Sequence, residues 1–433
     1  MLLVSMLVIL FVFSLAGMEI AWAIGLSAFV FILLSQLTDP FGVSFILFSQ
    51  QMIVGLDGFI LVAIPLFVFA GELMNVSGVT QRIVRMASAV VGHFHGGLAN
   101  VGVVANFIMS GISGSALADA AATGTVLIPE MKKRGFPADF SAAVISSAAT
   151  VGPIIPPSIS FVLLGAIVEV SVGRLFMGGV VPGFIMFVSM FVLTWWICRK
   201  RNYPVEERTT IREKGNAFLS GSLALLAPVF VVGSIVGGIA TPTEAATVAV
   251  FYTLFLGVVV YRTTKWRDIV EAAGRSAVAS SVIMLTVATS QVFAMLAVQE
   301  KLGVILTTAM LQVSENVYVL LFMANVLMLF LGMFMEILPI MLILAPILFP
   351  LFMGMGISDV HLGVVMVLNL MIGMITPPIG LNLFVLSAIS GEGVIEIFRE
   401  AVPYFVVLVL VLALITYYPP LTLFLADLVI PVK

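Results

Sequence analysis

Long, uninterrupted apolar runs limit how this chain can fold. A helix needs about 20 apolar residues to cross the hydrocarbon core of a bilayer. The runs that approach or exceed this length are 2–16, 20–37, 53–74, 174–198, 218–239, 243–261, 277–298 and 402–418. Of the 433 residues, 61% are hydrophobic and 9% are charged, too few charges to cover a soluble protein of this size. Because the runs are continuous rather than alternating, they also exclude a membrane β-barrel. We expect an all-α integral membrane protein in which residues 1–433 form one unit.

The Lys and Arg residues predict which loops lie in the cytoplasm, because cytoplasmic loops carry an excess of these residues. Loop 199–214 carries six of them, and none occurs between Lys301 and Arg399. We therefore place loop 199–214 inside and the N-terminus in the periplasm. Segments 80–92 and 263–277 mix basic and apolar residues, as is typical of helices lying along the inner membrane surface. No basic segment precedes the N-terminal run, which we interpret as a span rather than a cleaved signal peptide.

Two hydrophobic segments are interrupted at their centres. Segment 98–131 breaks at a run of serine and glycine over 110–115, and basic residues lie beyond both of its ends. Segment 317–352 breaks at 332–336, and no Lys or Arg flanks it. A segment whose two ends lie on one side of the membrane is a re-entrant hairpin. We expect the first hairpin to enter from the cytoplasm and the second from outside.

Each hairpin is followed by a span that paired prolines interrupt. The first such span is 138–169, with prolines at 156 and 157, and the second is 361–390, with prolines at 377 and 378. Proline removes a backbone donor and clashes with the preceding turn, so both helices must open. Unwound backbone at membrane depth persists only where protein or a water-filled cavity satisfies it.

The spacing of these features indicates an internal repeat. Gly152 and Gly373 are 221 residues apart, and so are Pro156 and Pro377. We expect two copies, 50–198 and 277–418, inserted with opposite orientations. Inverted repeats of this kind usually build secondary transporters, whose substrate and ion sites lie at the midplane between broken helices.

Polar residues at the breaks are the candidates for such a site. Hydroxyl and carbonyl oxygens suit a hard cation such as Na⁺, and the free amides of half-helices suit a carboxylate. The candidates are Ser110, Ser113 and Ser115 at the first tip, Thr150, Gly152, Pro153 and Ser158 in the first broken span, and Gly373, Thr376 and Asn382 in or near the second. Close helix packing and local capping are the alternative roles of these residues.

Two acidic residues within the hairpins are further candidates. Glu336 is the only acid of the second hairpin, and an ionisable group at membrane depth indicates function. Its alternative role is to cap the backbone of the tip. Asp119 in the first hairpin is a weaker candidate that could cap the following half-helix. Asn106, about one turn before the first tip, could either cap or coordinate.

Other motifs are structural or absent. Thr241, Pro242 and Glu244 form a predicted capping box with proline at the first helical position. The sequence has no phosphate-binding loop and no H-E-x-x-H, and Cys198 is its single cysteine. His93 and His95 alone are weak support for a metal site. We therefore expect no enzymatic activity, no nucleotide and no transition metal. The net charge of −3 also argues against a nucleic-acid partner.

Five motifs resemble the large membrane subunit of TRAP transporters, the tripartite ATP-independent periplasmic transporters. They are GISGSALADAAATG (111–124), IPEMKKRGFP (128–137), VGPIIPPS (151–158), TPTEAA (241–246) and ITPPIGLN (375–382). The resemblance covers essentially the whole chain and includes the sialic-acid type of this subunit. It implies an elevator-type, Na⁺-coupled importer of organic anions in a bacterial inner membrane. It also implies a separate four-helix membrane subunit and a periplasmic binding protein as partners.

The same resemblance implies positions for the ligands. The first Na⁺ site falls at Ser110, Ser113, Thr150 and Gly152, and the second at Gly332, Gly373 and Thr376. Substrate contacts fall at Ser113, Ser158 and Glu336, where many members carry Asp at the last position, and Asn382 is a further candidate. A sialic acid is the substrate we expect, while C4-dicarboxylates and other sugar acids stay open.

Two other functions fit part of the pattern. A stand-alone Na⁺/dicarboxylate symporter shares the layout of hairpins and broken helices, and it would work without a binding protein or a small subunit. A membrane anchor or an intramembrane enzyme fits less well, because unwound backbone in lipid is costly and an anchor has no use for it.

Overall fold

The computed structural model describes residues 2–38, 42–205 and 211–431, and every regular element in these ranges is a helix. Eight helical segments of this part are long and apolar enough to cross a membrane: Ile20–Thr38, Phe59–Val76, Val172–Lys200, Ala217–Val236, Pro242–Val260, Trp266–Gln299, Ile337–Gly354 and Val394–Tyr417. The predicted all-α, multi-pass membrane architecture is confirmed. The cytoplasmic placement of loop 199–214 stays a prediction, and residues 206–210 of this loop lie outside the described ranges.

The N-terminal helices depart from the prediction at one place. They are α1 (Leu2–Leu15), α2 (Ile20–Thr38), α3 (Phe45–Leu56), η1 (Phe59–Val62), α4 (Ala63–Val76) and α5 (Val79–Val91). The predicted span 53–74 begins too early, because Asp57 caps the end of α3 and Gly58 precedes a new helical segment, so the span covers Phe59–Val76. Helix α1, with 14 residues, is also shorter than a full span.

Two groups of helices contain the predicted breaks. The first group is α6 (Gly97–Ser113), α7 (Ala116–Lys133), α8 (Ala138–Ala149), α9 (Ile159–Val168) and α10 (Val172–Lys200). The second is α15 (Val317–Gly332), α16 (Ile337–Gly354), α17 (Asp359–Gly373), α18 (Leu381–Ser390) and α19 (Val394–Tyr417). Helix α16 begins and ends 221 residues after α7, the same offset as between the glycines and prolines of the sequence.

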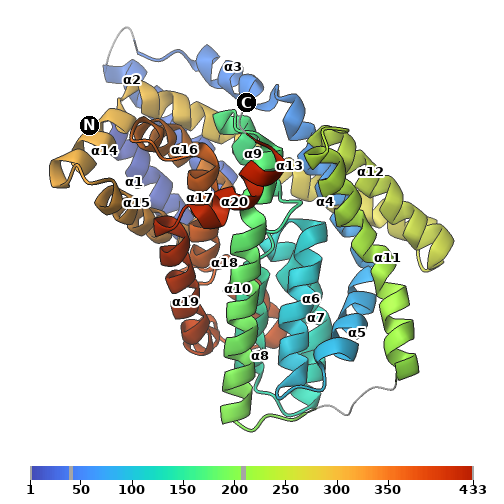
Figure 1. Cartoon of the computed structure of the whole chain (residues 1–433). Coiled ribbons are helices and arrows are strands. Elements are labelled where there is room, and N and C mark those ends of the chain that lie inside the picture. The colour runs from blue at the N-terminus through green and yellow to red at the C-terminus, as the bar shows by residue number, and fades with distance from the viewer. Residues whose placement is uncertain (1, 39–41, 206–210, 432–433) are drawn as a thin grey trace.

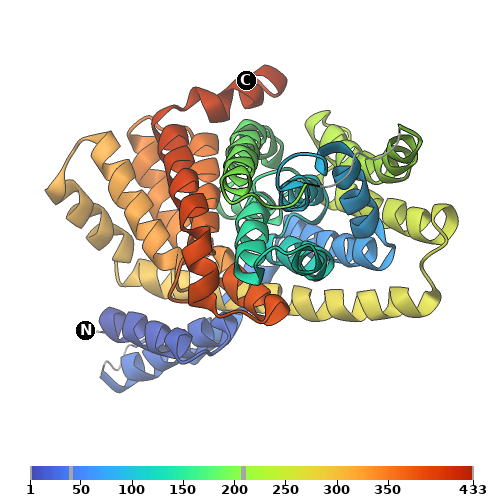
Figure 2. The same ribbon diagram turned by 90° about the horizontal axis from the view of Figure 1, so that it is seen from below.

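The remaining helices connect and flank these groups. They are α11 (Ile211–Val236), α12 (Pro242–Phe255), η2 (Leu256–Val260), α13 (Trp266–Gln299), α14 (Leu302–Val313) and α20 (Pro420–Val429). The capping box of Thr241 and Glu244 at the start of α12 is confirmed. Residues 266–277 do not form a helix of their own, because they are the first part of α13, which runs unbroken for 34 residues in all, and their placement along the inner membrane surface stays a prediction. Figure 2 shows α13 along the lower edge of the molecule.

Contacts between the two groups occur in pairs with exchanged roles. Helix α7 packs on α18 as α16 packs on α9, and α8 packs on α19 as α17 packs on α10. This exchange is the pattern of a two-fold relation between the groups. Figure 1 shows α6–α8 and α10 beside α17–α19. The broken helices α8 and α17 lie at the centre, since nearly all of their residues are buried. The insertion of the two groups in opposite directions stays a prediction.

Helices α10 and α19 are held together by a buried hydrogen bond between hydroxyl groups. Thr194 Oγ1 and Tyr404 Oη are 2.9 Å apart, and both side chains are fully buried. Removing one partner leaves the other unsatisfied in the core. Tyr404→Phe is therefore expected to reduce the free energy of unfolding by about 1–3 kcal/mol. Thermal unfolding in detergent measures this loss, with Tyr418→Phe, at an exposed tyrosine, as the control. Equal stability of the two variants would contradict the expectation.

Candidate functional site

The first hairpin tip is a two-residue break between α6 and α7. Gly114 takes the left-handed conformation (φ 61°), and Ser115 caps α7 by accepting a hydrogen bond from the Ala118 N–H at 3.4 Å. A Cβ at Gly114 would lie 2.7 Å from the carbonyl oxygen of Pro157. Glycine is therefore required here both by the backbone angle and by the close approach of the tip to the first broken span.

The first broken span is open over residues 150–157, between α8 and α9. No donor among the described residues reaches the carbonyl oxygens of Thr150 and Gly152. Pro156 lacks the N–H group that would serve the Gly152 carbonyl in a continued helix, and the Ile154 N–H, which would serve Thr150, donates to the carbonyl of Val151 at 2.9 Å instead. The opened segment therefore presents free carbonyl oxygens inside the protein.

Asp119 lies against this opened backbone. Its side chain is fully buried, and Oδ1 accepts a hydrogen bond from Ser113 Oγ at 2.6 Å. Oδ2 has no hydrogen-bond partner among the described residues, and a Cβ at Gly152 would lie 2.9 Å from it. A buried carboxylate costs several kcal/mol unless a cation or a proton compensates its charge. Ser113, Asp119 and Gly152 thus provide hydroxyl, carboxylate and carbonyl oxygens, the ligands that hard cations take.

The second tip and the second broken span touch through their backbones. A Cβ at Gly373 would lie 2.6 Å from the Cα of Gly332, and the Ile379 N–H donates to the carbonyl of Met333 at 3.1 Å. No described residue donates to the carbonyl oxygen of Gly332. Thr376 follows in the same loop, and its hydroxyl donates to the carbonyl of Ile372 at 2.8 Å. The structure therefore brings Gly332 and Gly373 together.

Both tips line one cavity of about 340 Å³, which we call the tip cavity. Its polar lining residues are Glu72, Asn75, Ser113, Ser115, Asp119 and Glu336. A smaller space of about 50 Å³ shares Ser115 and Glu336 and extends to Pro153, Met371 and Met374 of the broken spans. Of the four predicted substrate contacts, Ser113 and Glu336 therefore lie where the two tips meet the helices α4 and α13.

Glu336 occupies the N-cap position of α16 without capping it. Its side chain makes no capping hydrogen bond to the helix, and it lines both the tip cavity and the smaller space. At the equivalent position of the first group, Ser115 does cap α7. The alternative role of Glu336 as a cap is therefore not what the structure shows, and its carboxylate is available to a ligand in the cavity.

Three further predicted site residues, all outside the lining of the tip cavity, make hydrogen bonds within the protein. Ser110 Oγ donates to the carbonyl of Phe107 at 2.6 Å, and Ser158 caps α9 by accepting from the Phe161 N–H at 3.2 Å. Asn382 Nδ2 donates across from α18 to the carbonyl of Ser146 on α8 at 3.4 Å. All three side chains are buried. Their contact with an ion or a substrate stays a prediction.

Glu72 and Asn75 were not predicted as lining residues. Glu72 on α4 forms an ion pair with Arg275 on α13, with 2.8 Å between Oε2 and Nε. An acid within the otherwise apolar run 53–74 is the signal that could have identified Glu72. Asn106, by contrast, lies away from the cavity and accepts a hydrogen bond from Thr123 Oγ1 at 3.2 Å. This bond ties α6 to α7.

A buried polar network, also not predicted, holds the second hairpin on the second broken span. Asn369 Nδ2 on α17 donates to the Oδ1 of Asn325 on α15 at 2.7 Å, and Asn325 Nδ2 donates to Thr416 Oγ1 at 3.1 Å. The ring of His361 contacts Thr422 Oγ1 at 2.9 Å and the carbonyl of Thr416 at 3.2 Å. Amides within apolar helices are the sequence signal for such a network. Asn369 lies about one turn before Gly373, so the network fixes the contact between Gly332 and Gly373.

Comparison with known proteins gives consistent matches over most of the chain. The family model described as "Tripartite ATP-independent periplasmic transporter, DctM component" matches residues 7–421. The sialic acid TRAP transporter large permease protein SiaM of Vibrio cholerae is 38% identical over 413 residues, which are 95% of this chain and 96% of that protein. The C4-dicarboxylate TRAP transporter large permease protein DctM of Rhodobacter capsulatus is 36% identical over 434 residues, covering 97% and 98%.

A solved structure shares the fold. The YdaH transporter of Alcanivorax borkumensis superposes with a TM-score of 0.57 at 16% sequence identity, covering 86% of this chain and 88% of that one. At this identity the likeness concerns the arrangement of the helices alone.

The contact between Gly332 and Gly373 predicts the effect of one added methyl group. Gly373→Ala places its Cβ against the backbone of Gly332, so the tip must move, and overpacking of this kind costs about 1–3 kcal/mol. Gly354→Ala is the matched control, because nothing lies within 4 Å of a Cβ there. Thermal unfolding is expected to show a loss of stability for the first variant and none for the second. Equal stability would contradict the close contact.

Proposed function

We infer the function from one premise: the chain belongs to the DctM component family of tripartite ATP-independent periplasmic transporters, and it is a large permease of that class. We propose that it is a secondary active importer that couples entry of an organic acid anion to Na⁺. The observation that carries the proposal is Asp119. Its buried Oδ2 lacks a hydrogen-bond partner among the described residues and lies against the opened backbone at Gly152.

The first proposed Na⁺ site lies at the first tip and the first broken span. Asp119 and the carbonyl oxygens of Thr150 and Gly152 are buried and have free acceptor capacity, and Ser113 orients the carboxylate by its hydrogen bond. Ser110 lies further along α6 and completes the predicted set. Sodium would supply the positive charge that stabilises the buried carboxylate and would tie the tip to the broken span.

The second proposed Na⁺ site lies at the corresponding place in the other group. The free carbonyl of Gly332 and the adjacent Gly373 provide backbone oxygens, with Thr376 in the same loop. The structure supports this site less strongly than the first, since the carbonyl of Gly373 already accepts a hydrogen bond from the Thr376 N–H at 2.9 Å.

The proposed substrate site is the tip cavity. Ser115 can donate a hydrogen bond to a carboxylate, while Glu336 can accept hydrogen bonds from hydroxyl groups, as can Ser113, whose own hydrogen is donated to Asp119. This combination favours a hydroxylated acid, and we propose a sialic acid such as N-acetylneuraminate. The relative SiaM is named for sialic acid, whereas YiaN of Escherichia coli, 38% identical over 411 residues, is named for 2,3-diketo-L-gulonate. Sugar acids of either kind share the hydroxyl groups on which this inference depends.

We also propose how the transport cycle runs. The two groups α6–α10 and α15–α19 share the buried contacts described above and move together, while α4 and α13 belong to the scaffold against which they move. Binding of Na⁺ would order the tips before the substrate binds, so that only the fully loaded or the empty site crosses the membrane. The partners we propose are a small four-helix membrane subunit on a separate chain and a periplasmic binding protein, in a bacterial inner membrane.

Sodium coupling is tested by reconstituting the chain with its small subunit in proteoliposomes and adding the loaded binding protein. Uptake is expected only when an inward Na⁺ gradient is present, because the site is not neutralised without the cation. Equal uptake with K⁺ alone would reject the coupling. Uptake by this chain without binding protein or small subunit would instead support a stand-alone Na⁺/dicarboxylate symporter.

The role of Asp119 is tested by Asp119→Asn, which removes the negative charge and keeps the size of the side chain. The Na⁺ concentration that gives half-maximal uptake is expected to rise by about 10- to 100-fold, the loss of metal affinity that is typical when a residue supporting a metal site is mutated. The control is Glu130→Gln on the same helix, where the carboxylate is solvent-exposed and pairs with Arg134. An unchanged Na⁺ dependence in the Asp119 variant would remove the first site from the proposal.

A further inference from the structure

The tip cavity carries negative charge that its own lining does not balance. Three of its lining residues are acids, Glu72, Asp119 and Glu336, and no Lys, Arg or His lines it among the described residues. As carboxylates these groups repel an anion, most strongly where little water screens them. An organic acid can therefore bind there only if positive charge compensates, and the proposed Na⁺ ions supply one part of that charge.

The chain itself holds a cation at the edge of this cavity. Arg275 on α13 donates from Nε to Oε2 of Glu72 on α4 at 2.8 Å. Arg275 lies about one turn before Ala279, a lining residue, and so shares the face of α13 that forms the cavity wall. Within the described ranges, no other Lys or Arg forms an ion pair with a residue that lines the tip cavity.

Arg275 keeps most of its hydrogen-bonding capacity. A guanidinium group has five N–H donors in a planar fork, and in the described part of the chain only the one at Nε is donated. The side chain of Arg275 is 50% exposed and that of Glu72 is 25% exposed. An ion pair this accessible contributes little to stability, so Glu72 is a partner that a second carboxylate can replace or join. The two terminal nitrogens are free to bind that carboxylate in the bidentate manner typical of arginine.

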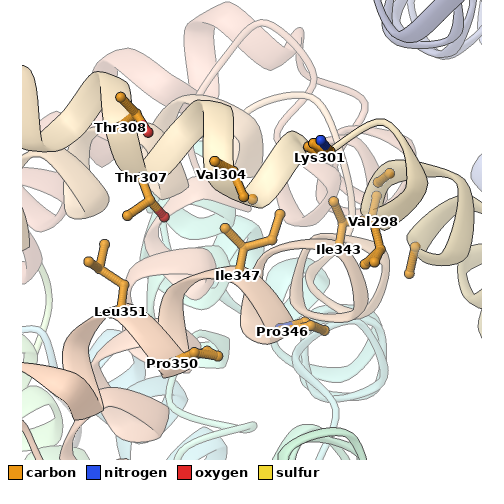
Figure 3. Close-up of a pocket in the computed structure, with 13 residues that line it drawn as sticks. Val298, Lys301, Val304, Thr307, Thr308, Ile343, Pro346, Ile347, Pro350 and Leu351 are labelled. Atoms are coloured by element: carbon orange, nitrogen blue, oxygen red, sulfur yellow. The ribbon is translucent and has the colours of Figure 1, made fainter.

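A different cavity also has a cation but lacks the other groups that an acid needs. It encloses about 450 Å³ between the corner of α13 and α14 and the helix α16, and Lys301 lies at it (Figure 3). Its other lining residues are apolar except for Thr307 and Thr308, and it shares none with the tip cavity. Lys301 is therefore a reference cation away from the proposed substrate site.

We propose that Arg275 is a substrate-binding residue, which takes the carboxylate of the organic acid at the edge of the tip cavity. In the empty site Glu72 holds the guanidinium by its Nε, and the entering carboxylate binds the free terminal nitrogens. The contact adds a charged partner to the hydroxyl donor that Ser115 provides, and it offsets the negative charge of the lining. This inference rests on the proposed function, since it assumes that the tip cavity takes an organic acid.

Binding of acids and of their uncharged amides to the detergent-purified full chain tests this contact. N-acetylneuraminate, 2,3-diketo-L-gulonate and succinate are titrated in NaCl, each beside the analogue with carboxamide in place of carboxylate. The rise of the unfolding temperature with ligand concentration gives each dissociation constant. Arg275→Gln is expected to weaken binding of the acid that the wild type prefers by about tenfold and to leave binding of its amide unchanged, because only the acid forms the charge-assisted pair.

Three further variants complete the series. Arg275→Lys keeps the charge but not the planar fork, and an intermediate loss of acid binding is expected. Glu72→Gln frees the guanidinium and removes a negative charge from the cavity, so it should bind the acid more tightly than the wild type does. The matched control is Arg267→Gln on the same helix, where the side chain is exposed and pairs with Glu271.

Lys301→Gln is a second control, and both controls are expected to bind acid and amide as the wild type does. Equal loss of acid and amide binding in Arg275→Gln is the result of a merely structural role and would overturn the inference, as would no loss of either. Weaker acid binding by Glu72→Gln would also contradict it. These results would leave the proposed function in place, whereas failure of the wild type to bind any of the three acids would contradict both.

Discussion

Backbone that leaves a helix inside a membrane must find partners within the protein, and this requirement governs the centre of the structure. Each broken span opens at its prolines, and each opening is covered by a hairpin tip that approaches through glycine. Gly114 lies against Pro157 in one group, and Gly332 lies against Gly373 in the other. The contacts are so close that a single methyl group would not fit at Gly114 or Gly373. The remaining free oxygens, at Thr150, Gly152 and Gly332, are then the natural ligands for a cation.

Asp119 places a buried carboxylate at the centre of the structure. A buried carboxylate that keeps one oxygen without a hydrogen bond is stable only when something neutralises it. A protein that binds Na⁺ there would couple the order of its tip to the ion, because the same carboxylate is hydrogen-bonded to Ser113 of the tip and lies close to Gly152 of the broken span. Binding of the cation and closure of the tip would then be one event. The substrate, bound in the adjoining tip cavity, would benefit from a tip that is already in place.

The sequence predicted the breaks but not how their surroundings are assembled. Glycine, serine and paired prolines act locally, so the ends of α6, α15, α8 and α17 could be placed from the chain alone, as could the 221-residue repeat. The break at Asp57 and Gly58 was missed, because one acid and one glycine in an apolar run are a weak local signal. Contacts over long sequence distances were not predictable: Glu72 with Arg275, and Asn325 with Asn369, meet only in the folded chain. For the same reason Glu336 was the stronger candidate from the sequence. In the structure it is Asp119 whose buried carboxylate has an oxygen without a hydrogen-bond partner among the described residues.

We propose above all that Na⁺ holds the two tips against the two opened spans. Hydrogen–deuterium exchange of the purified chain in NaCl and in KCl of equal concentration tests it directly. Sodium is expected to slow exchange at the backbone amides of 111–116 and 150–155, and of 332–337 and 373–380, while the middle of α10 stays the same. Identical exchange at all four segments in the two salts would contradict the account.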